Sequence, residues 1–157
     1  MKWIAVIVMA VAAGTAWADN GNQAVSGKTV WKKECSSCHI AYPPRFLTTG
    51  DWEQLMNGLD SHFGDNASLD NDTRHEILVY LKRHAGKGSR HSARSLRISD
   101  TRWFRSEHRE VPSKAWTNPA IRSRAHCTAC HINAERGDWS ERGVRLPAGL
   151  HMEDDDD

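Results

Sequence analysis

Two short motifs of the same kind constrain the chain most, CSSCH at residues 35–39 and CTACH at residues 127–131. All four cysteines belong to these motifs, in two C-x-x-C pairs, and a histidine directly follows each pair. Disulfide bonds or a zinc site with four thiolate ligands would account for the cysteines. Neither accounts for the two histidines, whereas C-x-x-C-H is the pattern of covalent c-type haem attachment. We therefore expect the chain to bind two haem c groups.

The spacing within each motif suits one helical turn, because residues at i and i+3 share a helix face and the residue at i+4 lies beside them. The expected thioether attachment residues are Cys35 and Cys38 for the first haem and Cys127 and Cys130 for the second. The proximal iron ligands are then His39 and His131. Pro43 and Pro44 are expected to end the helix that carries the first motif, and their loop can offer a backbone carbonyl to His39 Nδ1.

Each iron has a sixth coordination position, and its occupant decides between electron transfer and ligand chemistry. Beyond residue 18 the chain has two methionines and seven histidines outside the motifs, so supply favours histidine at both irons. His62 is the expected distal ligand of the first iron because it lies in a bend between two predicted helices. His108 is expected for the second iron, since it shares a predicted helix face with Phe104. His84 is the reserve candidate, while Met56 has the spacing of a buried helix face. The other four histidines are expected at the surface: His75, His91, His126 and His151.

The N-terminal segment indicates export. Residues 1–18 combine one cation at Lys2, an apolar run and the small-residue sequence Ala16-Trp17-Ala18, which is typical of a secretory signal peptide. A membrane anchor is disfavoured, because the apolar run is short and lacks a basic stop-transfer flank. We expect a periplasmic protein without a membrane span in its mature form.

The remaining chain divides into four predicted parts: an N-terminal haem unit (19–86), a basic linker (87–100), a smaller C-terminal haem unit (101–150) and an acidic tail (151–157). In the N-terminal unit, helices are predicted before Cys35, over 51–60 up to a break at Gly64, and over 71–84 with Asp70 as N-cap. In the C-terminal unit, Thr101 can cap a helix that Pro112 ends. The sequence thus predicts an all-α fold with little or no sheet.

The basic linker is rich in Gly, Ser and Arg, with no acidic residue over 86–99. A solvated surface segment is the simplest interpretation, with docking to an acidic partner or pairing with haem propionates as alternatives. Over the whole chain, 21 Lys and Arg face 20 Asp and Glu, and removal of residues 1–18 makes the totals equal. This balance gives no basis for nucleic-acid binding. Aromatic content of 8% leaves little apolar side chain for a core.

The sequence resembles the small periplasmic di-haem cytochromes c of proteobacteria. The similar segments are CSSCHIAYPPRFL, DWEQLMNGLDSHFGDNASLD, ILVYLKRHA, TRWFRSEHREVP and HCTACHINAERGDW. The resemblance implies an N-terminal unit similar to a mono-haem cytochrome c, a smaller C-terminal haem unit and bis-histidine ligation at low potential. It also implies electron exchange with a mono-haem c-type cytochrome or a membrane b-type cytochrome.

These observations predict a monomeric electron-transfer protein rather than an enzyme, because two bis-histidine irons leave no open coordination site. The alternative is a haem enzyme or gas sensor with one open iron position.

Overall fold

The computed structural model describes residues 20–152 of the protein. The predicted signal peptide and the last five residues of the acidic tail lie outside this range. The described chain is all-α: its elements are α-helices and short 3-10 helices, and within residues 20–152 β-pairing is limited to isolated bridges. No helix in the described part is long and apolar enough to span a membrane. The prediction of an all-α fold is confirmed.

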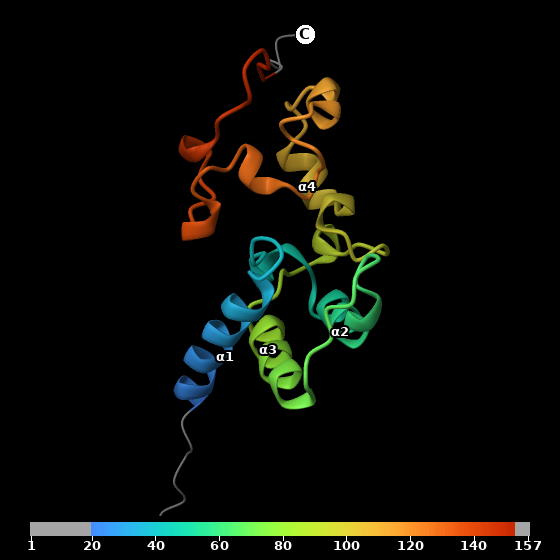
Figure 1. Ribbon diagram of the computed structural model, residues 1–157, viewed down its shortest axis with the longest axis vertical. Helices are drawn as coiled ribbons and strands as arrows, with labels where there is room; N and C mark the ends of the chain where they lie inside the picture. Colours follow the sequence, from blue (N-terminus) through green and yellow to red (C-terminus); the bar gives the residue numbers. More distant parts are fainter. Residues whose placement is uncertain (1–19, 153–157) are drawn as a thin grey trace, which may run out of the picture.

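Three helices form the N-terminal half, α1 (Asn20–Cys35), α2 (Thr49–Asn57) and α3 (Asn71–Arg83). Figure 1 shows them gathered at one end of the molecule, where α3 packs against both α1 and α2. Gly27 permits the close approach of α1 to α3, since a Cβ there would lie 2.9 Å from the Tyr80 Cβ. The core of this half contains nine buried residues: Trp31, Leu47, Trp52, Met56, Leu59, Ile77, Tyr80, Leu81 and Ala93. Met56 is 3% exposed, which confirms its predicted place in the core.

Local capping explains where the helices begin. The Asp70 carboxylate accepts a hydrogen bond from the Thr73 amide, as predicted for the N-cap of α3. In α2, Thr48 and Asp51 form a reciprocal capping box, so the helix begins two residues earlier than predicted. The predicted end near residue 60 lies three residues too far: α2 stops at Asn57 with Gly58 as its C-cap.

The helix that carries the first motif ends at Cys35, not at the prolines. Ser36 and Ser37 turn away from it, with their hydroxyls hydrogen-bonded to the Lys32 and Glu34 carbonyls. Pro44 instead begins a 3-10 helix, Pro44–Phe46, whose first carbonyl accepts a 2.6 Å hydrogen bond from Trp52 Nε1. The proline segment is thereby fixed to α2.

The C-terminal half has little regular structure. Its one described α-helix, α4 (Arg102–Glu107), is six residues long, begins at the Thr101 N-cap as predicted, and ends earlier than the predicted limit at Pro112. Short 3-10 helices make up the other helical turns of the described chain: Leu59–Ser61, Ser89–His91, Ile98–Asp100, Ser113–Thr117, Cys127–Ala129, Ala134–Arg136 and Glu141–Gly143. A small core of three buried residues, Ala115, Ile121 and Leu150, serves this half.

Aromatic side chains join the two halves. The Phe46 ring stacks on Trp103 at 4.7 Å between centroids and meets the edge of Trp139 at 4.9 Å. Tyr42 donates a 2.6 Å hydrogen bond from its hydroxyl to the Ala125 carbonyl. These contacts join the segment that follows the first motif to residues that come before and after the second motif in the sequence.

Candidate haem attachment and ligation sites

The first motif leaves its histidine in a defined orientation. His39 Nδ1 lies 2.8 Å from the Ile40 carbonyl oxygen, which directs the opposite ring nitrogen, Nε2, away from the backbone. The carbonyl was expected from the proline loop, but it comes from Ile40, the residue directly after the motif. The Tyr42 ring stacks on His39 at 4.8 Å between centroids. The imidazole is therefore held on one edge and one face.

His62 lies opposite this imidazole. The His39 and His62 ring centroids are 6.2 Å apart, with 27° between the ring planes. His62 follows the 3-10 helix Leu59–Ser61 and lies at the start of a tight turn, in which the Asp65 amide bonds to the His62 carbonyl. The structure thus brings together the two histidines that were predicted as axial ligands of the first iron.

The second motif lies on the 3-10 helix Cys127–Ala129, and the His131 amide bonds to the Cys127 carbonyl at 2.9 Å. The Cys130 amide also bonds to the Cys127 carbonyl, at 3.2 Å, so the motif forms one tight turn that is not continued into a longer helix. His131 Nδ1 is buried and has no hydrogen-bond partner among the described residues. A Trp139 ring lies 5.5 Å from the His131 ring.

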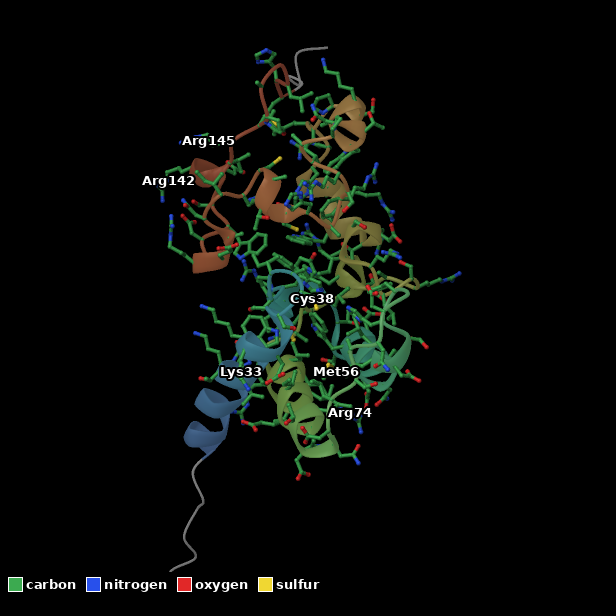
Figure 2. The ribbon with its side chains drawn as sticks, in the orientation of Figure 1. Lys33, Cys38, Met56, Arg74, Arg142 and Arg145 are labelled. Carbon is green, nitrogen blue, oxygen red and sulfur yellow. The ribbon has the colours of Figure 1, made fainter. Side chains whose placement is uncertain are left out.

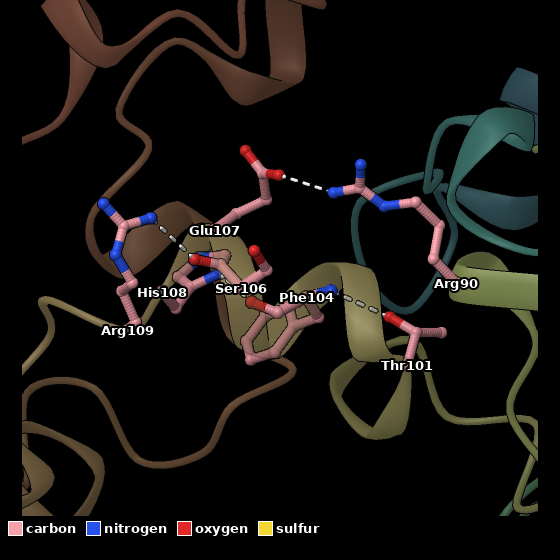
Figure 3. Close-up of polar contacts among 7 residues, drawn as sticks. All are labelled: Arg90, Thr101, Phe104, Ser106, Glu107, His108 and Arg109. Atoms are coloured by element: carbon pink, nitrogen blue, oxygen red, sulfur yellow. Dashed lines mark hydrogen bonds and ion pairs between the residues drawn. The ribbon is translucent and has the colours of Figure 1, made fainter.

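His108 faces this second imidazole, with ring centroids 6.0 Å apart and 70° between the planes. His108 is the C-cap residue of α4, immediately after its last turn. Its ring stacks on Phe104 at 4.0 Å, and its Nδ1 lies 2.9 Å from the Phe104 carbonyl oxygen. Figure 3 shows this arrangement together with the Thr101 cap that starts the helix. The short helix α4 thus orients the His108 ring.

Within each histidine pair, the two ring centroids have the separation that a metal ion bound between the rings would require. Two imidazoles on opposite sides of an ion, each with a nitrogen about 2.0–2.1 Å from it, place their ring centroids about 6.3 Å apart. The observed separations are 6.2 and 6.0 Å. In separation, each pair would therefore suit the two axial positions of one haem iron.

The protonation states of the buried imidazoles suit iron binding. Burial lowers the pKa values of His62, His108 and His131, so these imidazoles are neutral at neutral pH, which is the form that binds iron. Burial raises the pKa values of the Cys35 and Cys127 thiols to about 11, so both are uncharged.

A large cavity lies beside both motifs. Its volume is about 1080 Å³, and Cys38, His39 and Cys127 contribute to its wall. Cys38 lies near the middle of the molecule, between the two halves (Figure 2). The wall contains the acidic Glu135 and several polar residues, together with apolar and basic side chains, among them Trp31, Tyr42, Trp139, Lys28, Lys32, Arg45 and Arg136. A cavity of this size and lining suits flat, apolar groups with anionic substituents.

The zinc and disulfide alternatives are not formed in this structure. All four cysteines are free, and in residues 20–152 no three side chains of His, Cys, Asp or Glu gather into a metal-binding group. The two C-x-x-C pairs therefore do not meet as a four-thiolate site.

The other histidines lie elsewhere. His84 is an exposed residue at the C-terminal end of α3, with its Nδ1 2.9 Å from the Tyr80 carbonyl oxygen. His75, His126 and His151 are exposed, as expected, although His126 borders the cavity. His91 differs from its predicted surface position, because its Nδ1 is buried without a described partner. It packs against the Trp103 ring.

Sequence reasoning missed several aromatic residues that support the site. Tyr42, three residues after His39, stacks on that imidazole, and Trp139, eight residues after His131, contacts the second one. An aromatic residue within ten positions of each motif was the available signal. Phe46 and Trp103 carried no signal of this kind, since their contact joins segments far apart in the sequence.

A helical chain with two C-x-x-C-H segments, each facing a second imidazole, has the features of a c-type cytochrome with two haems. The chain belongs to the dihaem cytochrome c family, which it matches over residues 31–139. Proteins of this family carry covalently bound haem c for electron transfer, and the chain binds two such groups with their irons.

Solved structures agree with this assignment. A diheme cytochrome c from Shewanella baltica is 34% identical, covers 81% of this chain and 98% of its own length, and gives a TM-score of 0.68. A diheme cytochrome c from Rhodobacter sphaeroides is 41% identical, covers 69% of this chain and 94% of its own, and gives a TM-score of 0.61. A second structure from the same organism is 39% identical, with a TM-score of 0.60. Among curated proteins, none matches.

Proposed function

We propose that the protein is a periplasmic electron-transfer protein whose two haems both have bis-histidine iron ligation and low potential. The observation that carries this proposal is the pair of imidazole separations, 6.2 Å for His39–His62 and 6.0 Å for His108–His131. When bound, haem c supplies an iron that cycles between ferric and ferrous states.

The protein side chains have three tasks in this function. Cys35, Cys38, Cys127 and Cys130 tether the two groups. His39 and His131 serve as proximal ligands, and His62 and His108 close the opposite positions. His84 takes neither role, because its ring rests on Tyr80 at the exposed end of α3. An iron whose two axial positions are both occupied by histidine suits outer-sphere electron exchange rather than substrate binding.

Low potential follows from the ligand chemistry. Imidazole stabilises ferric iron better than a thioether does, and the chain keeps its Met56 side chain in the core, away from this task.

Export to the periplasm is supported by the signal-peptide pattern of residues 1–18. We propose other cytochromes as electron-exchange partners, either a mono-haem c-type cytochrome or a membrane b-type cytochrome. We also propose that the protein is a monomer.

Carbon monoxide tests the proposal directly. The full chain, expressed with haem-maturation machinery, is reduced and mixed with carbon monoxide while its absorption spectrum is followed. Two closed irons predict that the spectrum of the reduced protein does not change on mixing, because no carbon monoxide complex forms. Rapid carbon monoxide binding to one haem of the native protein would instead favour a haem enzyme or gas sensor.

A further inference from the structure

The loop that carries His62 is restrained by the basic linker. Phe63 follows His62 directly, and its ring meets the His62 ring edge-on at 4.8 Å between centroids. The Arg97 guanidinium lies over the outer side of Phe63, 4.3 Å from the ring centroid. A cation over an aromatic face at this distance is an attractive contact. One continuous set of contacts therefore runs from the linker to the distal histidine.

The Phe63 conformation needs such a restraint. Its φ of +55° lies in the left-handed region, which a bulky residue rarely adopts. Its side chain is 45% exposed, so core packing does not hold it in place. The Arg97 contact covers part of this exposed ring and favours the loop conformation in which the His62 ring lies near that of His39.

Arg97 is itself well anchored. The preceding residue, Leu96, has a φ of +59° and closes a tight turn with its amide bonded to the Ala93 carbonyl at 2.9 Å. Ala93 and Ile98, on either side of this turn, pack in the N-terminal core. Ser92 adds a 3.3 Å hydrogen bond to the Asp51 carboxylate at the start of α2. The linker thus presents Arg97 from a fixed backbone.

We propose that Arg97 is a positioning residue that keeps the sixth coordination position of the first iron closed, by holding Phe63 and with it the His62 loop. This inference rests on the proposed function, in which His62 is the distal ligand. It assigns the basic linker a role in ligation, different from both a solvated segment and a partner-docking surface.

Carbon monoxide binding to the reduced, haem-loaded full chain measures how often His62 leaves the iron. The kinetic component of carbon monoxide binding that changes in His62→Met is the one that belongs to the first haem. An exposed cation–π contact corresponds to roughly a two- to fivefold change in an equilibrium. We therefore expect Arg97→Ala to speed binding at the first haem roughly two- to fivefold, and Arg97→Lys to restore part of the wild-type value. Arg94→Ala, an exposed cation three residues earlier, is the matched control and should leave the rate unchanged.

A double-mutant cycle with Phe63→Ala isolates the contact. If Arg97 acts through Phe63, the double variant binds carbon monoxide no faster than the faster single variant. The inference is overturned if Arg97→Ala binds at the wild-type rate, if Arg94→Ala speeds binding equally, or if the two single effects add in full. The proposed function fails separately, when the wild-type protein itself binds carbon monoxide rapidly or His62→Met leaves both haems unaltered.

Discussion

Residues 20–86 place the first haem motif at the end of a 16-residue helix, whereas residues 101–152 place the second on a 3-10 helix of three residues. The first motif is backed by a core of nine buried side chains, and the second by a core of three. The first imidazole has a hydrogen bond at Nδ1, while the second has none from the described residues. The N-terminal half can therefore hold its shape by its own packing, whereas the C-terminal half depends on its haem and on aromatic contacts with its neighbour.

Removal of the covalent haem attachment from each half in turn should distinguish the two halves most strongly. In Cys127→Ala/Cys130→Ala we expect residues 101–152 to lose most of their amide exchange protection while α2 and α3 retain theirs, because three buried residues do not form an adequate core. In the matched variant, Cys35→Ala/Cys38→Ala, helix α3 should keep partial protection. Hydrogen exchange followed by mass spectrometry measures both. Equal loss in the two halves would remove the distinction between them.

Core truncation gives the next largest effect. Leu81 is fully buried between α3 and its neighbours, so Leu81→Ala should lower the free energy of unfolding by about 2–5 kcal/mol. Ile121→Ala should cost less, since its smaller core can collapse around the change. Denaturant unfolding of the haem-loaded protein measures both values. The exposed Val79 on the same helix provides the control, with a change within about 0.5 kcal/mol for Val79→Ala. An Ile121→Ala cost above that of Leu81→Ala would show that the second core is the stronger.

Replacement of the distal ligands tests the assignment of one pair to each half. His62→Met and His108→Met should each raise the midpoint potential of one haem by on the order of 100 mV, within the roughly 0.8 V range that axial ligands cover. Covalent attachment should remain intact, as a haem-stained denaturing gel would show. Redox titration measures the potentials, with His84→Met as the control that changes neither. A variant that shifts the midpoint potentials of both haems, or of neither, would disprove the assignment of the replaced histidine to one haem.

The helix caps give the smallest expected change. Thr101 accepts a 3.0 Å hydrogen bond from the Phe104 amide, and Thr101→Ala should cost about 1 kcal/mol of stability. Because α4 orients the His108 ring, the loss should fall on the C-terminal half, whereas Thr48→Ala should fray α2 alone. Hydrogen exchange assigns each loss to its half. Thr101→Ser keeps the hydroxyl and should recover most of the stability; no recovery would mean that the cap bond is not the cause.

Much of the site followed from the sequence because its signals are local. The motifs, the caps at Asp70 and Thr101, and the burial of Met56 each depend on residues within about one helical turn. The proximity of His62 to His39 was expected from a bend between helices, and the structure places the two ring centroids 6.2 Å apart. The roles of these histidines as ligands stay predictions.

The rest could not be predicted, since it depends on contacts between distant segments. The end of α1 at Cys35 is an exception, since it involves local serine hydroxyls that bond back to the helix carbonyls and not the prolines that follow. His91 was expected at the surface, yet it is half-buried, with its ring beside that of Trp103. The linker composition indicated a solvated segment, whereas Ala93 packs in the core and Arg97 lies over Phe63. Composition does not reveal which exposed residue finds an aromatic partner.

Electron paramagnetic resonance of the fully oxidised, haem-loaded protein tests bis-histidine closure of both irons most directly. The angle between two axial imidazole planes controls the splitting of the iron d orbitals, and the two pairs differ, at 27° and 70°. We expect two low-spin ferric signals of different anisotropy, the near-parallel pair giving the more rhombic one, with all iron accounted for. A substantial high-spin ferric signal would contradict closure, because it requires an iron whose sixth position no histidine occupies.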